Sequence, residues 1–339
     1  MTEVERYADR GRWREFCRTL WYRVPFLRET GIGTCRALDW RAHWTRYQTK
    51  VRLLETRLKV YRMEESGIQT PERPTPRLIV SLTSHPPRIA ESYAAVYSLL
   101  TQSLKPDKVV LWLAQSQFPC KEHDLPWELL HLRQFGLSIQ WCEDLKALKK
   151  ILPSLRAYPD DIVVLADDDI LYPSNWLERL YAAHQKDPTS IQARVTYRVF
   201  RNEHFHYYLR RNFLFFGKEA PPSLLYVPLA RMGVLYPPHV LTEEVLRTDL
   251  AMQFAPYDDE LWCWMMMIVS GAKVHALCGG WEDLIELPLA RPLAARLVEF
   301  CMYFGHALAE FYPEVRTILV EEERAMPQAL GYAPVGPGV

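Results

Sequence analysis

The chain has 339 residues, which at roughly 150 residues per domain predicts about two domains, or one large domain with extensions. Hydrophobic residues make up 49% and charged residues 24% of the sequence, which is ordinary globular usage and excludes a disordered chain, a collagen and a coiled-coil rod. Lys and Arg together number 41, and so do Asp and Glu. Because the net charge is zero, nothing draws the whole protein to nucleic acid, and we expect no nucleic-acid partner.

The charge is unevenly distributed along the chain. Residues 1–70 contain 15 Lys and Arg against 9 Asp and Glu and form a basic N-terminal arm. Residues 71–339 contain 26 Lys and Arg against 32 Asp and Glu, so the body is acidic. Within this basic arm, large apolar residues recur at steps of three and four, which predicts a helix that Gly67 ends. The stripe consists of Trp40, Trp44, Tyr47, Val51, Leu54, Leu58 and Tyr61. A weaker stripe, interrupted by Pro25, runs from Trp13 to Leu27.

Two roles suit such an arm. A basic helix rich in aromatic residues can lie on an anionic membrane surface. The alternative is a helix that packs on the body, or on a second copy in a homodimer, with its Arg side chains in solvent. After the arm, Pro71, Pro74 and Pro76 predict a stiff linker over residues 71–76 that cannot continue a helix.

The cysteines and the apolar runs predict a cytoplasmic protein. The seven Cys are widely spaced and form no C-x-x-C pair, which is typical of reduced thiols. No stretch near the start resembles a secretory signal, and the longest apolar run, Leu261–Val269, is about half of the ~20 residues that span a bilayer. We expect a cytoplasmic location, with peripheral contact at the inner face of the cell membrane as the alternative.

After the linker, short apolar runs alternate with helix-like segments. The expected strands are Leu78–Thr83, Val109–Leu113, Leu137–Trp141 and Ile162–Ala166, and the expected helical segments are Ile89–Leu104, Trp127–Phe135 and Leu145–Leu155. This alternation predicts an α/β fold with a parallel sheet covered on both faces. Such sheets bind ligands at the carboxyl ends of their strands, so the residues that follow each strand are the first candidates for a site.

Three consecutive carboxylates, Asp167 to Asp169, follow the expected strand Ile162–Ala166. Crowded carboxylates raise one another's pKa unless a cation neutralises them. Oxygen-only ligands suit Mg²⁺ or Mn²⁺, which takes further ligands from water or substrate phosphates. A solvated acidic turn before a helix would have the same sequence, but the position at a strand end favours a metal site.

Six segments of the sequence, in this order along the chain, together resemble a bacterial glycosyltransferase of the GT-A fold. They are similar to the family 2 type enzymes that build surface polysaccharides. The resemblance covers about residues 77–277 and is carried by VSLTSHPPRI, KPDKVVLWLAQSQFP, WCEDLKALKKILPSL, YPDDIVVLADDDILYPSNWLERLY, GVLYPP and PYDDELWCWMMMIVSGAKV. It implies a GT-A domain over residues 77–285, a Rossmann-like, mostly parallel sheet with helices on both faces. The basic arm precedes this domain, and residues 286–339 form a C-terminal helical extension and tail.

The resemblance also implies a donor site. Asp167 and Asp169 would hold Mn²⁺ or Mg²⁺ against the diphosphate of a nucleotide-sugar, with a UDP-sugar as the first expectation, and Asp168 would face the sugar. Residues after the first and third strands would contact the nucleotide. They are Thr83, Ser84, Arg88, Asp144 and Lys149.

The acceptor side needs a base. In an inverting enzyme of this kind, one carboxylate takes the proton from the acceptor hydroxyl, on a glycan or glycolipid. The resemblance places this base in Asp258-Asp259-Glu260. This segment has one acidic residue more than the usual motif, so the alignment does not decide which residue is the base. Asp259 is the first choice and Asp258 the second. A helix cap is the ordinary alternative for both residues.

Other assignments remain open at this stage. His204, His206 and His275 are weaker metal candidates, and Arg194 is a candidate for the donor phosphate. A sugar nucleotidyltransferase would also use such a sheet, a metal and a nucleotide, although its Gly-rich basic signature is missing after the first strand. A non-catalytic protein that binds glycan or nucleotide on a GT-A scaffold is the other alternative.

Overall fold

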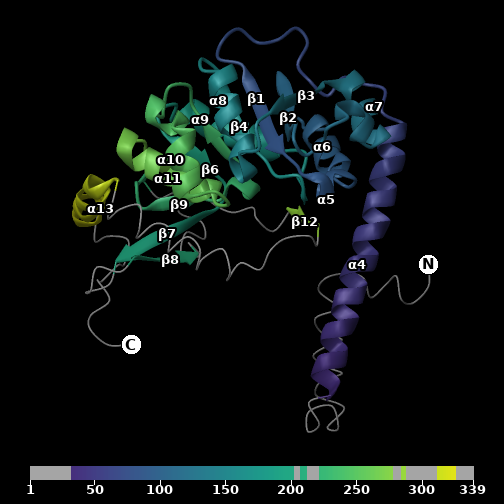
Figure 1. Cartoon of the computed structure of the whole chain (residues 1–339), viewed down its shortest axis with the longest axis horizontal. Helices are drawn as coiled ribbons and strands as arrows, with labels where there is room; N and C mark the ends of the chain where they lie inside the picture. Colours follow the sequence, from purple (N-terminus) through teal and green to yellow (C-terminus); the bar gives the residue numbers. More distant parts are fainter. Residues whose placement is uncertain (1–31, 202–206, 212–220, 278–283, 288–310, 326–339) are drawn as a thin grey trace. The chain divides into compact units, whose positions relative to one another are not determined.

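The computed structural model describes residues 32–201, 207–211, 221–277, 284–287 and 311–325 (Figure 1). The chain divides into two compact units, Met1–Leu54 and Glu55–Val339. Helix α4, Ile32–Tyr61, begins in the first unit and ends in the second, and it confirms the helix predicted from the apolar stripe. The weaker stripe between Trp13 and Leu27 lies outside the described residues. The domain boundaries proposed from the sequence stay predictions.

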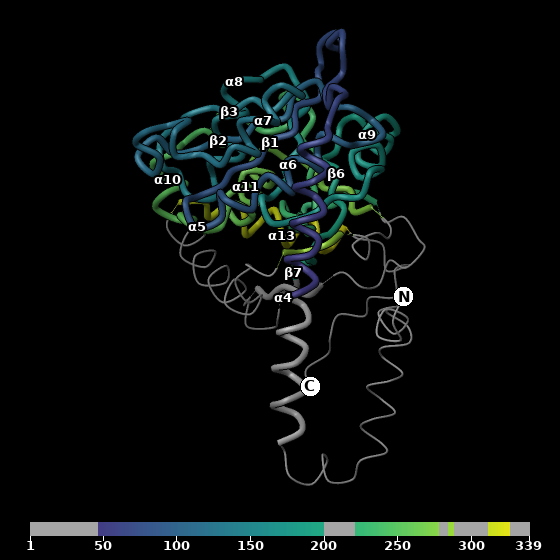
Figure 2. Tube along the Cα trace, turned by 90° about the vertical axis from the view of Figure 1, so that its right-hand side faces the viewer, coloured from purple at the N-terminus to yellow at the C-terminus, as the bar shows by residue number. Residues whose placement is uncertain are grey.

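The second unit is built on a seven-stranded sheet with the order β11-β6-β10-β4-β1-β2-β3. Its strands are β1 Leu78–Thr83, β2 Lys108–Ala114, β3 Leu137–Cys142, β4 Ile162–Leu165, β6 Ile191–Ala193, β10 Val234–Tyr236 and β11 Val274–Ala276. All neighbouring strands are parallel except β10, which is antiparallel to β4 and β6. The tube trace shows β1, β2 and β3 as neighbours in space (Figure 2). The predicted α/β fold class with a mostly parallel sheet is confirmed.

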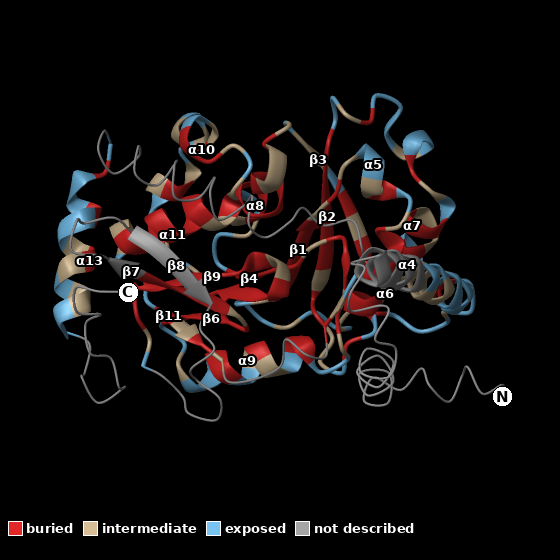
Figure 3. Cartoon of the chain, turned by 90° about the horizontal axis from the view of Figure 1, so that it is seen from below, coloured by how far each residue is buried: buried red, intermediate tan, exposed pale blue. Residues whose placement is uncertain are grey.

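Helices cover both faces of this sheet, because parallel strands need crossover connections. The crossovers contain α5 Pro86–Ile89, α6 Tyr93–Leu100, α7 Trp127–Leu132, the 3₁₀ helix η3 Lys146–Lys150, α8 Leu152–Ala157 and α9 Trp176–Lys186. Figure 3 shows α8, α10 (Thr248–Phe254) and α11 (Asp259–Ser270) on one side of the buried strands, with α6 and α9 on the other. Strands β1 and β4 are buried along almost their whole length, which explains their continuous apolar sequences.

Three smaller elements complete the described structure. Strands β7 Thr196–Arg201, β8 Tyr207–Arg211 and β9 Tyr226–Pro228 form an antiparallel sheet, and β5 Ile170–Leu171 pairs with β12 Ile285–Glu286. Helix α13, Pro313–Ala325, supports the expected helical C-terminal extension. Among the described helices, none combines the length and the apolar character that crossing a lipid bilayer requires.

The expected helical segments are shorter or divided in the structure. Ile89–Leu104 contains α6, Tyr93–Leu100, and Trp127–Phe135 consists of α7 and a 3₁₀ helix, Arg133–Phe135. The segment Leu145–Leu155 is divided into η3 and α8. Pro153 has no backbone N–H and its ring would collide with the carbonyl of Lys149, so an α-helix cannot run through this point. Lys146, with φ of +52°, turns the chain sharply at the start of η3. The tight turn brings the backbone of Lys150 next to β1, where its carbonyl accepts a hydrogen bond of 2.5 Å from Ser81 Oγ.

Gly233 sits where the chain enters β10, with φ of +111°. A Cβ at this position would overlap the indole of Trp176, which is fully buried and donates a 2.9 Å hydrogen bond from Nε1 to the carbonyl of Met232. We therefore predict that Gly233→Ala lowers the free energy of unfolding by about 3 kcal/mol, from backbone strain and overpacking together. Urea unfolding of the wild type and the variant at pH 7 measures this loss of stability.

A second glycine gives the matched control. Gly271 ends α11 with φ of +67°, and an added Cβ there meets no atom within 4 Å. Gly271→Ala therefore carries backbone strain alone and should cost about 1 kcal/mol. Equal losses for the two variants would show that the indole does not limit the space at Gly233.

Candidate active site

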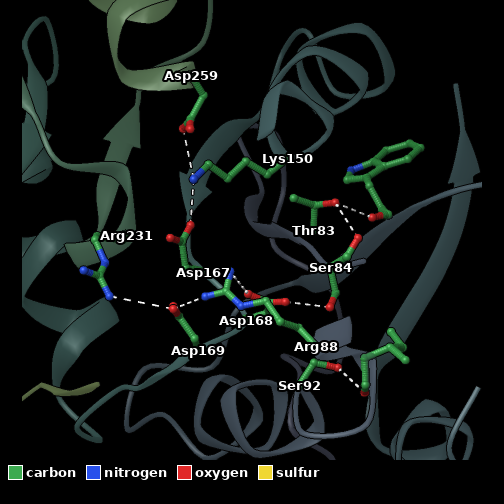
Figure 4. A network of polar contacts seen from close by, with 12 residues as sticks. Thr83, Ser84, Arg88, Ser92, Lys150, Asp167, Asp168, Asp169, Arg231 and Asp259 are labelled. Atoms are coloured by element: carbon green, nitrogen blue, oxygen red, sulfur yellow. Dashed lines mark hydrogen bonds and ion pairs between the residues drawn. The ribbon is translucent and has the colours of Figure 1, made fainter. Parts of the chain in front are cut away.

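The acidic triplet lies at the carboxyl end of β4, next to the carboxyl end of β1. These strands pair in parallel, so the residues after them meet at one edge of the sheet. Figure 4 shows the three carboxylates among side chains that come from four other segments of the chain. Asp168 and Asp169 are 5% and 3% exposed, so their charges must be balanced locally. An acidic turn open to solvent, the alternative considered from the sequence, does not describe these two residues.

Asp168 is held by the segment that follows β1. Its Oδ2 accepts a 2.6 Å hydrogen bond from Ser84 Oγ, and its Oδ1 lies 3.2 Å from Arg88 Nη1. Burial raises the pKa of Asp168 to about 6, although Arg88 and the hydrogen bond from Ser84 act in the opposite direction. Ser84 and Arg88, which the resemblance assigned to the nucleotide, therefore lie beside the triplet and contact its carboxylates.

Asp169 contacts two guanidinium groups. Arg88 Nη2 donates to its Oδ2, and Arg231 Nη2 lies 3.8 Å from the same oxygen. Arg231 belongs to the 3₁₀ helix η4, Ala230–Met232, and its Nη1 also lies 3.5 Å from Glu286 Oε1. The backbone carbonyl of Asp169 accepts a 2.8 Å hydrogen bond from the N–H of Leu287, so the segment around β12 holds this edge in place. The sequence analysis did not identify Arg231.

Lys150 connects the triplet to the second carboxylate cluster. Its Nζ lies 2.6 Å from Asp167 Oδ1 and 2.9 Å from Asp259 Oδ2, and its side chain is 6% exposed. Burial would lower the pKa of Lys150, but the two carboxylates outweigh it and raise the pKa, so the ammonium is charged. Figure 4 shows this line of contacts from Asp259 through Lys150 to Asp167. Two regions that are far apart in sequence are thus joined by one buried cation.

The two candidates for the base have different roles in the structure. Asp258 is the N-cap of α11, and its Oδ1 accepts a 3.0 Å hydrogen bond from the N–H of Leu261. Asp259 is the first residue of α11, is 4% exposed, and directs its carboxylate to Lys150. The ordinary capping role therefore applies to Asp258, and Asp259 shares Lys150 with Asp167 of the triplet.

Three of the residues predicted to contact the nucleotide, Thr83, Asp144 and Lys149, have polar contacts of their own, separate from those of the acidic triplet. Lys149 is buried, with Nζ 3.1 Å from Gln117 Oε1 and 3.6 Å from Asp144 Oδ1. Asp144 also pairs with Lys146 at 2.5 Å. The pKa of Lys149 is lowered, mainly by burial, and Asp144 only partly offsets this. Thr83 donates from Oγ1 to the carbonyl of Trp112 at 2.8 Å, which ties the end of β1 to β2.

His85 indicates that these two groups are near each other. Its pKa is lowered by burial first, and then by the positive charges of Arg88 and Lys149. His85 is therefore neutral at pH 7, and one cation from each group acts on it.

The weaker candidates either have contacts elsewhere in the sheet or lie outside the described residues. His275, on β11, has Nδ1 2.8 Å from Gln192 Oε1, a hydrogen bond between adjacent strands. Arg194 is buried, and its backbone N–H donates to the carbonyl of Gly233 at 3.1 Å. His204 and His206 lie outside the described residues.

The donor set partly fits a divalent metal. Asp167 and Asp169 offer the carboxylate oxygens that Mg²⁺ and Mn²⁺ prefer. Each already has a protein cation beside it, Lys150 for Asp167 and two guanidinium groups for Asp169. In the part of the chain that the structure describes, three or more His, Cys, Asp or Glu side chains do not gather into a metal site. A metal would therefore share these carboxylates with protein cations and take its other ligands from elsewhere.

Comparisons with known proteins find similar architectures at low sequence identity. No protein-family model matches the sequence, and neither does any curated protein. A mannosyltransferase from Pyrobaculum calidifontis, solved with GDP-Man and Mn²⁺, has 15% identity and a TM-score of 0.42, covering 86% of this chain and 88% of its own. TarS 1–349 of S. aureus with UDP has 11% identity and a TM-score of 0.43, over 77% and 73%. An inositol-1-phosphate CTP transferase from T. maritima has 13% identity and a TM-score of 0.39, over 68% and 97%. Two glycosyltransferases and one nucleotidyltransferase thus have similar TM-scores to this chain. These scores are too low to assign an activity to it.

Proposed function

We propose that the protein is a glycosyltransferase that moves a sugar from a nucleotide-diphosphate sugar to a hydroxyl of a glycan or glycolipid, in surface polysaccharide synthesis. One observation carries the proposal: Lys150 bridges Asp167 of the triplet and Asp259 of the second cluster. The resemblance of the sequence assigns the donor to the first cluster and the base to the second. Transfer needs both at one place, and a shared ion pair supports that arrangement.

On the donor side, the residues present would hold a charged diphosphate. Asp167 and Asp169 would bind Mn²⁺ or Mg²⁺, which supplies positive charge for the departing nucleoside diphosphate. Arg88 and Arg231 lie against the same carboxylate of Asp169 and add positive charge at this edge. Ser84 and Arg88 hold Asp168 in place, which would keep this carboxylate oriented when the donor enters. Thr83, Asp144 and Lys149 are proposed to contact the base and ribose.

On the acceptor side, Asp259 is proposed as the general base. In an inverting displacement the acceptor oxygen forms a bond to the anomeric carbon while the bond to the diphosphate oxygen breaks. The hydroxyl proton passes to Asp259, and the nucleoside diphosphate leaves with the electron pair. Lys150 is a positioning residue in this scheme, because its contact with Asp259 holds the carboxylate in place.

The donor site is tested by thermal unfolding with UDP-, GDP-, CMP- and dTDP-sugars, each with Mn²⁺ and with EDTA. Because a ligand of the native state stabilises it by mass action, a donor at 100 times its Kd adds about 2.7 kcal/mol. We expect one nucleotide class to raise the melting temperature in the presence of metal, and Asp169→Asn to remove the metal-dependent part. Asp160→Asn is the matched control, since Asp160 is exposed and contacts His239.

Three results would contradict the proposal. An unchanged melting temperature with every nucleotide-sugar would show that the protein has no donor site. A metal-dependent shift without release of the nucleoside diphosphate, over a range of glycan acceptors, would favour a binding protein. Release of pyrophosphate from a nucleoside triphosphate and a sugar phosphate would identify a nucleotidyltransferase.

A further inference from the structure

Helix α4 carries an exposed row of large apolar side chains. Tyr47 is 59% exposed, Leu54 60%, Leu58 58% and Tyr61 70%, with the partly buried Val51 between the first two. We call these five residues the α4 seam. Single exposed apolar residues are common on protein surfaces, but a continuous row of them usually marks an interaction surface. The ring of Tyr61 also meets Trp127, itself 43% exposed, edge-on at 6.2 Å, which extends the apolar surface at this end.

The opposite side of the same helix packs on its own unit. Thr56 is 8% exposed and Val60 is fully buried, while Leu58, between them in sequence, projects from the other side of the helix. On the flank, Arg57 forms an ion pair with Glu128. Within the second unit, the C-terminal end of α4 is therefore anchored by one side, while Leu58 and Tyr61 remain exposed.

The spacing of the seam is that of a two-stranded coiled coil. Its steps are four, three, four and three residues, and Trp40 and Trp44 continue the same alternation towards the N-terminus of the helix. Over Trp40–Tyr61 this makes three consecutive heptads with apolar residues at positions a and d. A narrow a/d stripe is typical of a helix-to-helix seam, whereas a globular core needs a broader apolar face.

The narrow width of the seam and one complementary pair of charges favour a second copy over a lipid surface. A helix that lies on a bilayer needs a broad, strongly amphipathic apolar face, whereas the seam is a narrow stripe. The exposed charged residues beside it are Lys50, Glu55, Arg57 and Arg62, and Arg57 already pairs with Glu128 of its own chain. With Leu54 at position d, Lys50 is a g residue and Glu55 is the e residue that follows it. In a parallel pair of helices, g of one helix meets this e of the other, so Lys50 of each copy meets Glu55 of the other.

We infer that α4 mediates homodimerisation through a parallel two-stranded coiled coil, in which the α4 seam of one copy packs against that of the other. The inference rests on the helix alone and is independent of the proposed glycosyltransferase activity. Sedimentation equilibrium of the full chain tests it. The wild type should sediment as a dimer in the micromolar range, and Leu58→Glu should weaken association at least about 10-fold by placing paired charges in the seam.

Lys59→Glu is the matched control, because Lys59 is exposed, adjacent to Leu58 and outside the seam. It should leave the dimer intact. Circular dichroism should be the same for both variants, since Leu58 is not part of the core. A monomeric wild type, or equal effects of the two variants, would overturn the inference. So would a monomer that floats with phosphatidylserine vesicles through the seam, which would assign the surface to lipid.

Charge exchange tests the register of the helices. Lys50→Glu alone and Glu55→Lys alone should each weaken the dimer by about fivefold, because two symmetric attractive pairs become repulsive. The double variant should restore wild-type association, since the pairs are re-formed with the signs reversed. Single variants without any effect would overturn the parallel arrangement.

Discussion

Asp259→Asn is expected to lower the rate of sugar transfer by about 10²–10⁴-fold, the contribution typical of a general base, with donor binding unchanged. The amide keeps the shape of the side chain but cannot accept the acceptor's proton. Lys150 keeps a partner in this variant, because its ion pair with Asp167 remains. We therefore expect kcat to fall while the thermal shift with the donor stays at the wild-type value.

Asp258→Asn provides the comparison within the same motif. Asp258 caps α11 through the N–H of Leu261, and Asn is as good an N-cap as Asp. This variant should therefore keep both its stability and most of its transfer rate. If Asp258→Asn loses activity and Asp259→Asn does not, the base is the capping residue and our assignment is wrong.

Much of the fold can be predicted from short apolar runs. β1 matches its predicted limits and β2, β3 and β4 differ from theirs by one or two residues, because strands buried on both faces of a parallel sheet have continuous apolar sequences. The division of the segment 145–155 was not predicted, although Pro153 was a visible signal. Proline lacks the N–H that a continuous helix needs, so the residue type marks a break that the apolar pattern does not show.

The candidate site was predicted only in part, for a physical reason. Positions just after strands are visible in the sequence, and Ser84, Arg88 and the triplet were found there. Lys150 was missed and its neighbour Lys149 chosen, because the direction of each side chain depends on the tight 3₁₀ turn of η3. Arg231 precedes an antiparallel strand that joins the middle of the sheet, and local sequence carries no signal that this strand pairs with β4.

Lys150→Met is expected to lower the free energy of unfolding by about 3–5 kcal/mol, the cost of removing one partner from a buried ion pair. Methionine has a similar length and fills the space, so the loss comes from charge. It leaves the carboxylates of Asp167 and Asp259 without the ammonium that both contact. Urea unfolding at pH 7 measures it, and Lys150→Arg, which keeps the charge, should lose less.

A double-mutant cycle separates this electrostatic effect from a packing defect. In Lys150→Met with Asp259→Asn, one of the two uncompensated carboxylates is gone, so the double variant should be more stable than Lys150→Met alone by about 1–3 kcal/mol. Lys150→Met with Asp258→Asn is the control, because Asp258 caps α11 through the N–H of Leu261 and Asp259 is the residue that pairs with Lys150, so we expect no recovery. Equal recovery in both would mean that general charge repulsion at the start of α11 is responsible. Recovery with Asp259→Asn and not with Asp258→Asn would show that the two carboxylate clusters are coupled through Lys150. Such coupling is expected if donor and acceptor bind at one site, as the proposed transfer requires.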